Sequence, residues 1–244
     1  MLNQFSRSEL IFGKEATHTL SGSRVAVFGL GGVGGYVVEA LARMGIGTLD
    51  IIDSDCVNVT NINRQIIALH STVGQKKTDA FEKRIKDINP LCTVNKHDVF
   101  YLPEMAGDFD FGVYDYVVDA VDTVSAKIDI AVRCTSLGVR VISSMGTGNK
   151  TDPTALKVAD IYDTKVCPLA RAMRSELKKR GVPALKVVYS EESPTEQDSE
   201  ALLEYKENTP DFNGRAVPGS NAFVPPAAGL IIASEVIKDL IFRR

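Results

Sequence analysis

A glycine-rich turn near the start of the chain has the composition and spacing of a phosphate-binding loop. The turn lies between an apolar segment at residues 24–28 and a helical pattern at residues 33–44. Its four glycines are Gly29, Gly31, Gly32 and Gly34. Glycine lets a backbone approach a phosphate closely, and a helix start offers free N–H groups and a positive dipole end. The turn therefore predicts binding of a phosphate-bearing nucleotide.

Asp53 is the second candidate, at the end of the next apolar segment, residues 48–53. An acidic residue at that place in a nucleotide-binding fold typically binds ribose hydroxyls. The glycine turn also matches the dinucleotide-binding pattern GxGxxG. On these two features alone, a nicotinamide-dependent dehydrogenase would be the favoured interpretation.

Two cations and a further acid change that interpretation. Arg64 and Lys77 follow Asp53 in the chain, and Asp122 follows an apolar segment at residues 116–120. A hydride transferase has no use for two cations placed beyond the ribose, whereas a triphosphate does. A carboxylate at the carboxyl edge of a sheet, such as Asp122, is well placed to hold Mg²⁺ against phosphate oxygens. The set therefore predicts a site for ATP and Mg²⁺.

These residues must be positioned by alternating strands and helices. Helical patterns at residues 74–88 and 124–137 separate the apolar segments, which continue with further strands at residues 93–99 and 139–143. Strands that alternate with helices of this length pair in parallel through right-handed crossovers. We therefore expect an α/β fold with a doubly wound, mostly parallel, Rossmann-like sheet that has helices on both faces.

The chain divides by character near residue 150. Residues 1–150 form the expected adenylation core, and residues 151–244 are expected to complete the same domain as a C-terminal extension. The second part begins with strands and a basic helix, then becomes acidic and turn-rich at residues 190–214, where no period predicts regular structure. We expect a mobile loop there. The final helix is expected to open at Pro225 and to lie buried in the core or at a dimer interface.

Between Phe5 and Gly148 these motifs together resemble the ubiquitin-activating-enzyme-like adenylyltransferases, which include activators of thiamin and molybdopterin sulfur carriers. The resemblance rests on the glycine turn, the segments TNINR and VGQKK, and VDAVDT around Asp122. It implies that ATP is contacted by Gly32, Asp53, Asn61, Arg64, Lys77 and Asp122. It also implies a homodimer in which Arg7 reaches across to the ATP of the partner.

The cysteines bear on which member of that family is expected. Cys56, Cys92, Cys134 and Cys167 are scattered and form no CxxC pair, so a structural zinc site and a disulfide scaffold are excluded. Carrier activators commonly have two CxxC pairs and an acceptor cysteine. Cys167 has no nearby residue to activate it, and we interpret it as an inert thiol. A carrier-protein adenylyltransferase stays the alternative, and sulfur-transfer partners such as a cysteine desulfurase stay open.

A basic helix favours tRNA as the substrate. Arg171, Arg174 and Lys178 share one face of a helix predicted at residues 169–180. A cationic ridge suits a phosphate backbone, although a net charge of −3 excludes binding of nucleic acid by overall charge alone. Residues 146–174 also resemble the tRNA threonylcarbamoyladenosine dehydratase branch of the family. That branch implies ATP-dependent cyclisation of the modified nucleoside, with adenylation of its threonyl carboxylate.

The surroundings of the protein are expected to be the cytoplasm. The amino-terminal residues are polar and lack the apolar core of a signal peptide. The longest apolar run, residues 227–233, is too short and too closely followed by charges to cross a bilayer. We therefore expect no membrane association, and the few cysteines fit a reducing compartment.

Overall fold

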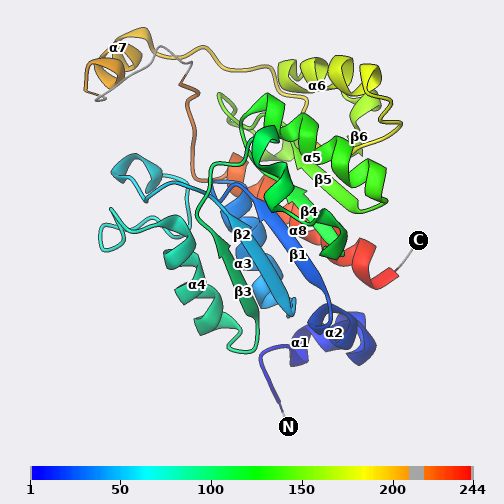
Figure 1. The fold of residues 1–244 in the computed structure, drawn as a ribbon. Coiled ribbons are helices and arrows are strands. Elements are labelled where there is room, and N and C mark those ends of the chain that lie inside the picture. Colours follow the sequence, from blue (N-terminus) through cyan, green and yellow to red (C-terminus); the bar gives the residue numbers. More distant parts are fainter. Residues whose placement is uncertain (1, 209–216, 243–244) are drawn as a thin grey trace.

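In the computed structural model, which describes residues 2–208 and 217–242, a single seven-stranded sheet forms the centre of the molecule (Figure 1). The strands are β1 (Arg24–Phe28), β2 (Thr48–Ile52), β3 (Thr93–His97), β4 (Tyr116–Asp119), β5 (Arg140–Ser144), β6 (Leu156–Asp160) and β7 (Lys186–Ser190). Their order is β3-β2-β1-β4-β5-β7-β6. All neighbours pair in parallel except β6 and β7. The predicted α/β fold with a mostly parallel sheet is confirmed.

Helices cover both faces of this sheet. They are α1 (Ser6–Phe12), α2 (Lys14–Ser21), α3 (Gly34–Arg43), α4 (Lys77–Ile88), α5 (Val124–Leu137), α6 (Pro168–Lys179), α7 (Ser199–Glu207) and α8 (Val224–Phe242). In β1, Val25 and Val27 belong to the core cluster with α3, α4 and α8, whereas Ala26 and Phe28 face the cluster with α5. Side chains of a strand alternate between faces, so β1 is apolar throughout because both of its faces are covered.

The strand order reverses between β1 and β4, which is where ligands bind in open α/β sheets. Gly29 follows β1 directly and has a φ of +88°, a left-handed conformation that glycine adopts without strain. A Cβ at Gly29 would lie 2.7 Å from the carbonyl oxygen of Ala120, which follows β4. The two strand ends therefore come together only because residue 29 has no side chain.

The long terminal helix is part of the core, as predicted. Ten residues of α8 are buried, among them Ala228, Ile232 and Val236. A Cβ at Gly229 would lie 2.4 Å from the carbonyl oxygen of Val33, so α8 contacts the start of α3 directly. The helix begins at Val224, with Pro225 and Pro226 in its first turn. Backbone N–H groups in a first turn have no partner within the helix, so the missing N–H of proline costs no hydrogen bond there. Its expected alternative place, a dimer interface, stays a prediction.

The prediction of a loop at residues 190–214 is wrong in the middle of that segment. Residues 199–207 form the helix α7, whose N-cap is Asp198; the Asp198 carboxylate accepts a hydrogen bond from the backbone N–H of Ala201. No residue of α7 is buried. The helix therefore needs no regularly spaced apolar face, and its sequence shows no helical period. The cap residue was the available signal. The rest of the segment beyond residue 208 lies outside the described residues up to Val217.

Within the described residues no helix is long and apolar enough to cross a bilayer.

Candidate active site

A cavity of about 340 Å³ opens where β1 and β4 end. Eight of the residues singled out in the sequence line it: Gly29, Gly31, Gly32, Asp53, Asn61, Arg64, Lys77 and Asp122. Two later segments complete the wall, with Gly148 from the turn after β5 and residues 218–220 before α8. We call this cavity the nucleotide pocket. Neither of the later segments had a sequence signal for a role in this cavity.

The glycines of the turn serve two different purposes. Gly31 and Gly32 line the nucleotide pocket, and a Cβ at Gly32 would lie 3.2 Å from Cγ of Arg64. Gly34 is buried and does not line it. A Cβ at Gly34 would lie 1.8 Å from the carbonyl oxygen of Gly29, so this glycine allows the turn to fold back on the first residue of α3. The structure therefore gives Gly34 a packing role in the turn, and its predicted contact with the nucleotide stays a prediction.

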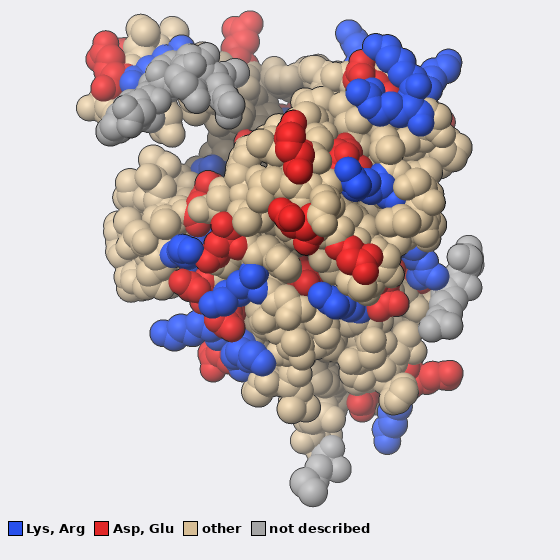
Figure 2. Space-filling model, in the orientation of Figure 1, with Lys and Arg blue, Asp and Glu red and all other residues tan. Residues whose placement is uncertain are grey.

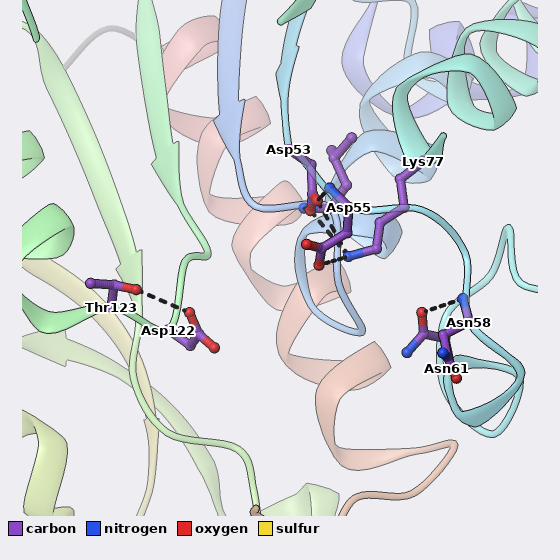
Figure 3. Close-up of polar contacts among 8 residues, drawn as sticks. Asp53, Asp55, Asn58, Asn61, Lys77, Asp122 and Thr123 are labelled. Carbon is purple, nitrogen blue, oxygen red and sulfur yellow. Dashed lines mark hydrogen bonds and ion pairs between the residues drawn. The ribbon is translucent and has the colours of Figure 1, made fainter. Parts of the chain in front are cut away.

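Asp53 and Lys77 form the centre of a polar cluster at the end of β2 (Figure 3). The Asp53 carboxylate accepts hydrogen bonds from the backbone N–H groups of Leu30, at 2.7 Å, and Asp55, at 2.8 Å. Lys77 is buried; its Nζ lies 2.7 Å from Asp55 and 3.3 Å from Asp53. Asp53 thus fixes the glycine turn while it faces the pocket, and the Lys77 ammonium is held at the pocket wall by two acids.

Arg64 is half-buried and also lines the pocket. Its Nη1 donates to the carbonyl oxygen of Thr60, at 3.0 Å, and to Oδ1 of Asn63, at 2.8 Å. Burial lowers the pKa of Arg64, while the nearby Tyr205 of α7 acts in the opposite direction. An arginine remains protonated under such shifts, so the pocket has a second fixed cation.

Asn61 ends the short 3₁₀ turn Val59–Asn61 that leads to Arg64. Its Oδ1 accepts from the backbone N–H of Asn58 at 3.0 Å, and the side chain of Asn58 accepts from the N–H of Thr60 at 2.9 Å. These reciprocal bonds form a capping box. Asn61 therefore shapes the turn that positions Arg64 and also lines the pocket.

Asp122 lies on the β4 side of the pocket, across from Lys77 and Asp53 (Figure 3). Its carboxylate is exposed, and its one described partner is the Thr123 hydroxyl, at 3.4 Å. In the described part of the chain no group of three or more His, Cys, Asp or Glu residues could hold a metal ion. A single carboxylate fits Mg²⁺ when phosphate oxygens and water supply the other ligands.

A buried ion pair behind Asp122 was not predicted from the sequence. The Lys127 Nζ is fully buried and lies 3.0 Å from the Asp119 carboxylate. The same ammonium donates to the carbonyl oxygen of Val121 at 3.1 Å, and so fixes the segment that carries Asp122. Asp119 is hidden in the apolar run of β4, and Lys127 lies on α5, so only the tertiary structure joins them.

The basic helix is only partly as predicted. Arg171 and Lys178 are exposed on α6, and Figure 2 shows Lys and Arg side chains gathered over this helix. Arg174 is half-buried instead, and its Nη1 donates to the carbonyl oxygen of Thr164 at 2.9 Å, which makes it part of the packing of α6. Cys167, just before α6, is buried at 3% exposure, as an inert thiol would be.

Arg7 lies far from the nucleotide pocket of its own chain. It is exposed on α1, which Figure 1 shows at the amino-terminal ends of the strands, whereas the pocket is at their carboxyl ends. Arg7 is not among the described residues that line the pocket. Its predicted contact with ATP therefore requires a second copy of the chain.

Comparison with known proteins agrees with this geometry. The family model described as ThiF family matches residues 5–241. A protein of Bacillus subtilis (strain 168) named tRNA threonylcarbamoyladenosine dehydratase is 46% identical over 244 residues, which is 99% of this chain and 96% of that protein.

Solved structures of an Escherichia coli protein described as tRNA N6-threonylcarbamoyladenosine dehydratase share the fold. Its complex with AMP has a TM-score of 0.86 and 31% identity, and covers 98% of this chain and 94% of that chain. Its complex with ATP has a TM-score of 0.85 at 31% identity, with the same shares covered. Since the family model and these relatives each span nearly the whole chain, the protein belongs to the ThiF family.

Proposed function

We propose that the protein catalyses the ATP-dependent dehydration of threonylcarbamoyladenosine in tRNA, next to the anticodon. The observation that carries the proposal is the convergence of the glycine turn, the cations Arg64 and Lys77 and the exposed carboxylate of Asp122 on a single cavity. A chain with this site is 46% identical, over 99% of its length, to a protein named for that reaction. The Escherichia coli protein named for the same reaction has been solved with both ATP and AMP.

The first step makes an unreactive acid reactive. A carboxylate oxygen of the threonyl group attacks the α-phosphorus of ATP, the bond to the bridging oxygen breaks, and pyrophosphate leaves with the electron pair. The carboxyl group is now an acyl-adenylate with AMP as its leaving group. A carboxylate is already the nucleophilic form, so this step needs no general base.

The second step closes a ring. The carbamoyl group of the same modification attacks the activated carbonyl carbon and loses a proton to solvent, and AMP departs with the electrons of the broken bond. The nucleoside has lost the elements of one water molecule, which are accounted for by the conversion of ATP to AMP and pyrophosphate. No protein thiol takes part, in agreement with the buried Cys167.

The lining residues that were predicted from the sequence each have a place in this scheme. The turn at Gly29, Gly31 and Gly32 receives phosphate, and Asp53 and Asn61 bind the ribose side of ATP. Arg64 and Lys77 stabilise the negative charge that develops on the α-phosphate and pyrophosphate, because cations held in position act strongly on such charge. Asp122 is the protein ligand of Mg²⁺, which neutralises phosphate charge when it is bound.

A homodimer completes the site in this proposal, with Arg7 reaching the ATP of the partner. The short helix α1 has no buried residue and exposes Leu10, at 85%, and Ile11, at 78%. Exposed apolar side chains grouped near an arginine fit a surface that a second copy covers. The proposed place of action is the cytoplasm, where modified tRNA is found. We propose no sulfur-transfer partner, because the reaction uses no sulfur.

The decisive test is a mass measurement on tRNA. Purified protein is incubated with ATP, Mg²⁺ and total tRNA that carries threonylcarbamoyladenosine, and the nucleosides are analysed after digestion. We expect a product lighter by one water molecule, together with AMP and pyrophosphate. A matched reaction with the Asp122→Ala protein controls for chemical cyclisation. Pyrophosphate release with a ubiquitin-like carrier protein but not with tRNA would favour the alternative adenylyltransferase activity.

A further inference from the structure

A second cavity of about 460 Å³ adjoins the nucleotide pocket, and the reaction scheme gives it no role. We call it the side chamber. Its outer wall is α7, with Leu202 and Tyr205, and Figure 1 shows this helix beyond the carboxyl ends of the strands, apart from the helices that cover the sheet. Its inner wall consists of residues 149–151 and 217–221. The side chamber and the nucleotide pocket share Arg64 and residues 218–220.

Residues 217–220, which contain the shared segment, form a partition that is held from several sides. The Asn63 Nδ2 donates to the carbonyl oxygen of Ser220 at 3.0 Å, and the Gln197 Nε2 donates to the carbonyl oxygen of Val217 at 2.7 Å. Asn149 binds Gly219 twice: its backbone N–H donates to the Gly219 carbonyl oxygen at 2.8 Å, and its Oδ1 accepts from the Gly219 N–H at 2.6 Å. These hydrogen bonds hold the partition in a defined position between the two cavities.

Among the described lining residues, Arg64 is the charged side chain that the two cavities have in common. Its Nη1 is bound to Thr60 and Asn63, while Nε and Nη2 make no hydrogen bond to the residues that the structure describes. A guanidinium has five N–H donors in a planar fork that suits a carboxylate or a phosphate. An acid in the side chamber would therefore meet a cation that also borders the nucleotide pocket.

The lining of the side chamber selects the kind of ligand. Leu202 and Tyr205 offer an apolar and an aromatic surface, on which a nucleobase can stack. The charged side chains of the lining balance, with Glu196 and Asp198 opposed by Arg64 and Lys150, so the chamber suits a ligand with a single charge better than one with several phosphate groups. A volume of about 460 Å³ is in the range of cavities that hold small molecules. A base with an uncharged linker and one terminal carboxylate, directed at Arg64, matches these features.

We infer that the side chamber receives the threonylcarbamoyl-bearing nucleoside of the tRNA, unstacked from its neighbours, with its carboxylate directed past the partition to Arg64 and the α-phosphate of ATP. The inference rests on the proposed function and adds to it the place where the reacting nucleoside is bound. Enzymes that act on a base commonly take it out of the stack into such a cavity. The basic face of α6 then binds the tRNA backbone separately.

The chain has no tryptophan, so one introduced tryptophan reports on the side chamber alone. In the Tyr205→Trp protein the introduced tryptophan lines the side chamber. In the control protein, Leu203→Trp, the tryptophan replaces a residue of α7 that is 60% exposed and does not line the chamber. Free threonylcarbamoyladenosine nucleoside is titrated in the presence of a non-hydrolysable ATP analogue. We expect saturable quenching in Tyr205→Trp, none in Leu203→Trp, and at least tenfold weaker binding of unmodified adenosine. Equal responses of both proteins, or no response in either, would overturn the inference.

A second variant tests turnover. Leu202→Trp fills the side chamber, and we expect it to raise the KM for modified tRNA at least tenfold while the affinity for ATP and the overall affinity for tRNA stay at the wild-type values. Leu203→Trp is the matched control. If wild-type protein dehydrates the nucleoside and Leu202→Trp does so with an unchanged KM, the chamber assignment fails and the proposed function stands. If wild-type protein forms no dehydrated product, the proposed function itself fails. Should Leu202→Trp not fold, the titration of Tyr205→Trp decides.

Discussion

Lys76 and Lys77 are adjacent in the sequence but differ in what surrounds them. The Lys77 side chain is 5% exposed and paired with Asp53 and Asp55 at the pocket wall, whereas the Lys76 side chain is 52% exposed and paired with Asp98 away from it. A surface ion pair contributes little to stability, and a cation fixed in a pocket contributes strongly to binding charge in a transition state. The two lysines therefore form a matched pair for mutation.

We predict that Lys77→Met lowers the rate of ATP–pyrophosphate exchange by roughly 10²–10³-fold, the usual effect of removing one fixed donor from a transition state. Lys76→Met is expected to keep the rate within about twofold, because its loss removes only an exposed ion pair. Isotope exchange between pyrophosphate and ATP, with modified tRNA present, measures both, and thermal unfolding checks that each variant is folded. Equal losses in the two variants would contradict a special role for Lys77.

Asp50, the middle residue of β2, predicts a pH dependence of stability. Burial raises the pKa of this carboxyl, but bonds from Arg24, His97 and Asn95 outweigh burial and lower it from 3.8 to about 2. The Arg24 guanidinium binds both carboxylate oxygens at 2.8 Å. A group with a lowered folded-state pKa stabilises the fold above its unfolded pKa and loses that effect as the pH falls through the folded value.

The wild-type free energy of unfolding should therefore fall by about 2 kcal/mol more than that of Asp50→Asn between about pH 5 and pH 2, since each pKa unit corresponds to about 1.4 kcal/mol. Asp50→Asn is expected to be less stable at neutral pH, because it leaves Arg24 without its carboxylate. Urea unfolding of both proteins across this range is the measurement. Parallel pH profiles of the two proteins would show that Asp50 does not carry the dependence.

At the scale of the element, α6 presents some of its basic residues to solvent and uses another for packing. Arg171 and Lys178 are exposed, and Lys179 and Arg180 pair with Glu176, while Arg174 is bonded to Thr164. Only the first two combine exposure with the absence of a partner among the described residues. A change in charge at these two positions should act on tRNA and leave the fold intact.

The double variant Arg171→Glu/Lys178→Glu is predicted to weaken tRNA binding by roughly tenfold or more and to reduce the slope of log K against log salt by about two, one for each lost cation. ATP affinity should not change. Electrophoretic or fluorescence binding assays at several salt concentrations give the slope. Lys83→Glu, an exposed charge reversal on α4, is the control for a charge reversal elsewhere on the surface. A slope that stays at the wild-type value would remove α6 from the tRNA-binding surface.

At the scale of the whole molecule, the position of Arg7 makes a prediction about the dimer. If Arg7 acts on the ATP of the partner, Arg7→Ala and Asp122→Ala homodimers are both inactive, but a mixed dimer has one complete site. Equal mixing with subunit exchange produces half mixed dimers, so about a quarter of the wild-type activity should return. Dehydration assays before and after mixing measure this. No recovery, with exchange verified by tagged subunits, would mean that Arg7 does not act across the dimer.

The sequence by itself determined the features that depend on neighbouring residues. Alternation of apolar strands with helices predicted a mostly parallel sheet, and the glycine turn after residue 28 predicted the phosphate site, because chain direction and backbone freedom are local properties. The helix at residues 124–137 was predicted to its ends, since Gly138 adopts the left-handed conformation that closes it.

Only the tertiary structure decided features that join distant segments. Gly34 packs closely against Gly29, and Arg174 is bonded to Thr164, and neither structural role could be read from the residue type. The pair of Lys127 and Asp119 and the partition at residues 217–220 arise from segments far apart in sequence. Burial and hydrogen-bond partners are set by what the fold brings together, and the type of a residue does not specify its neighbours.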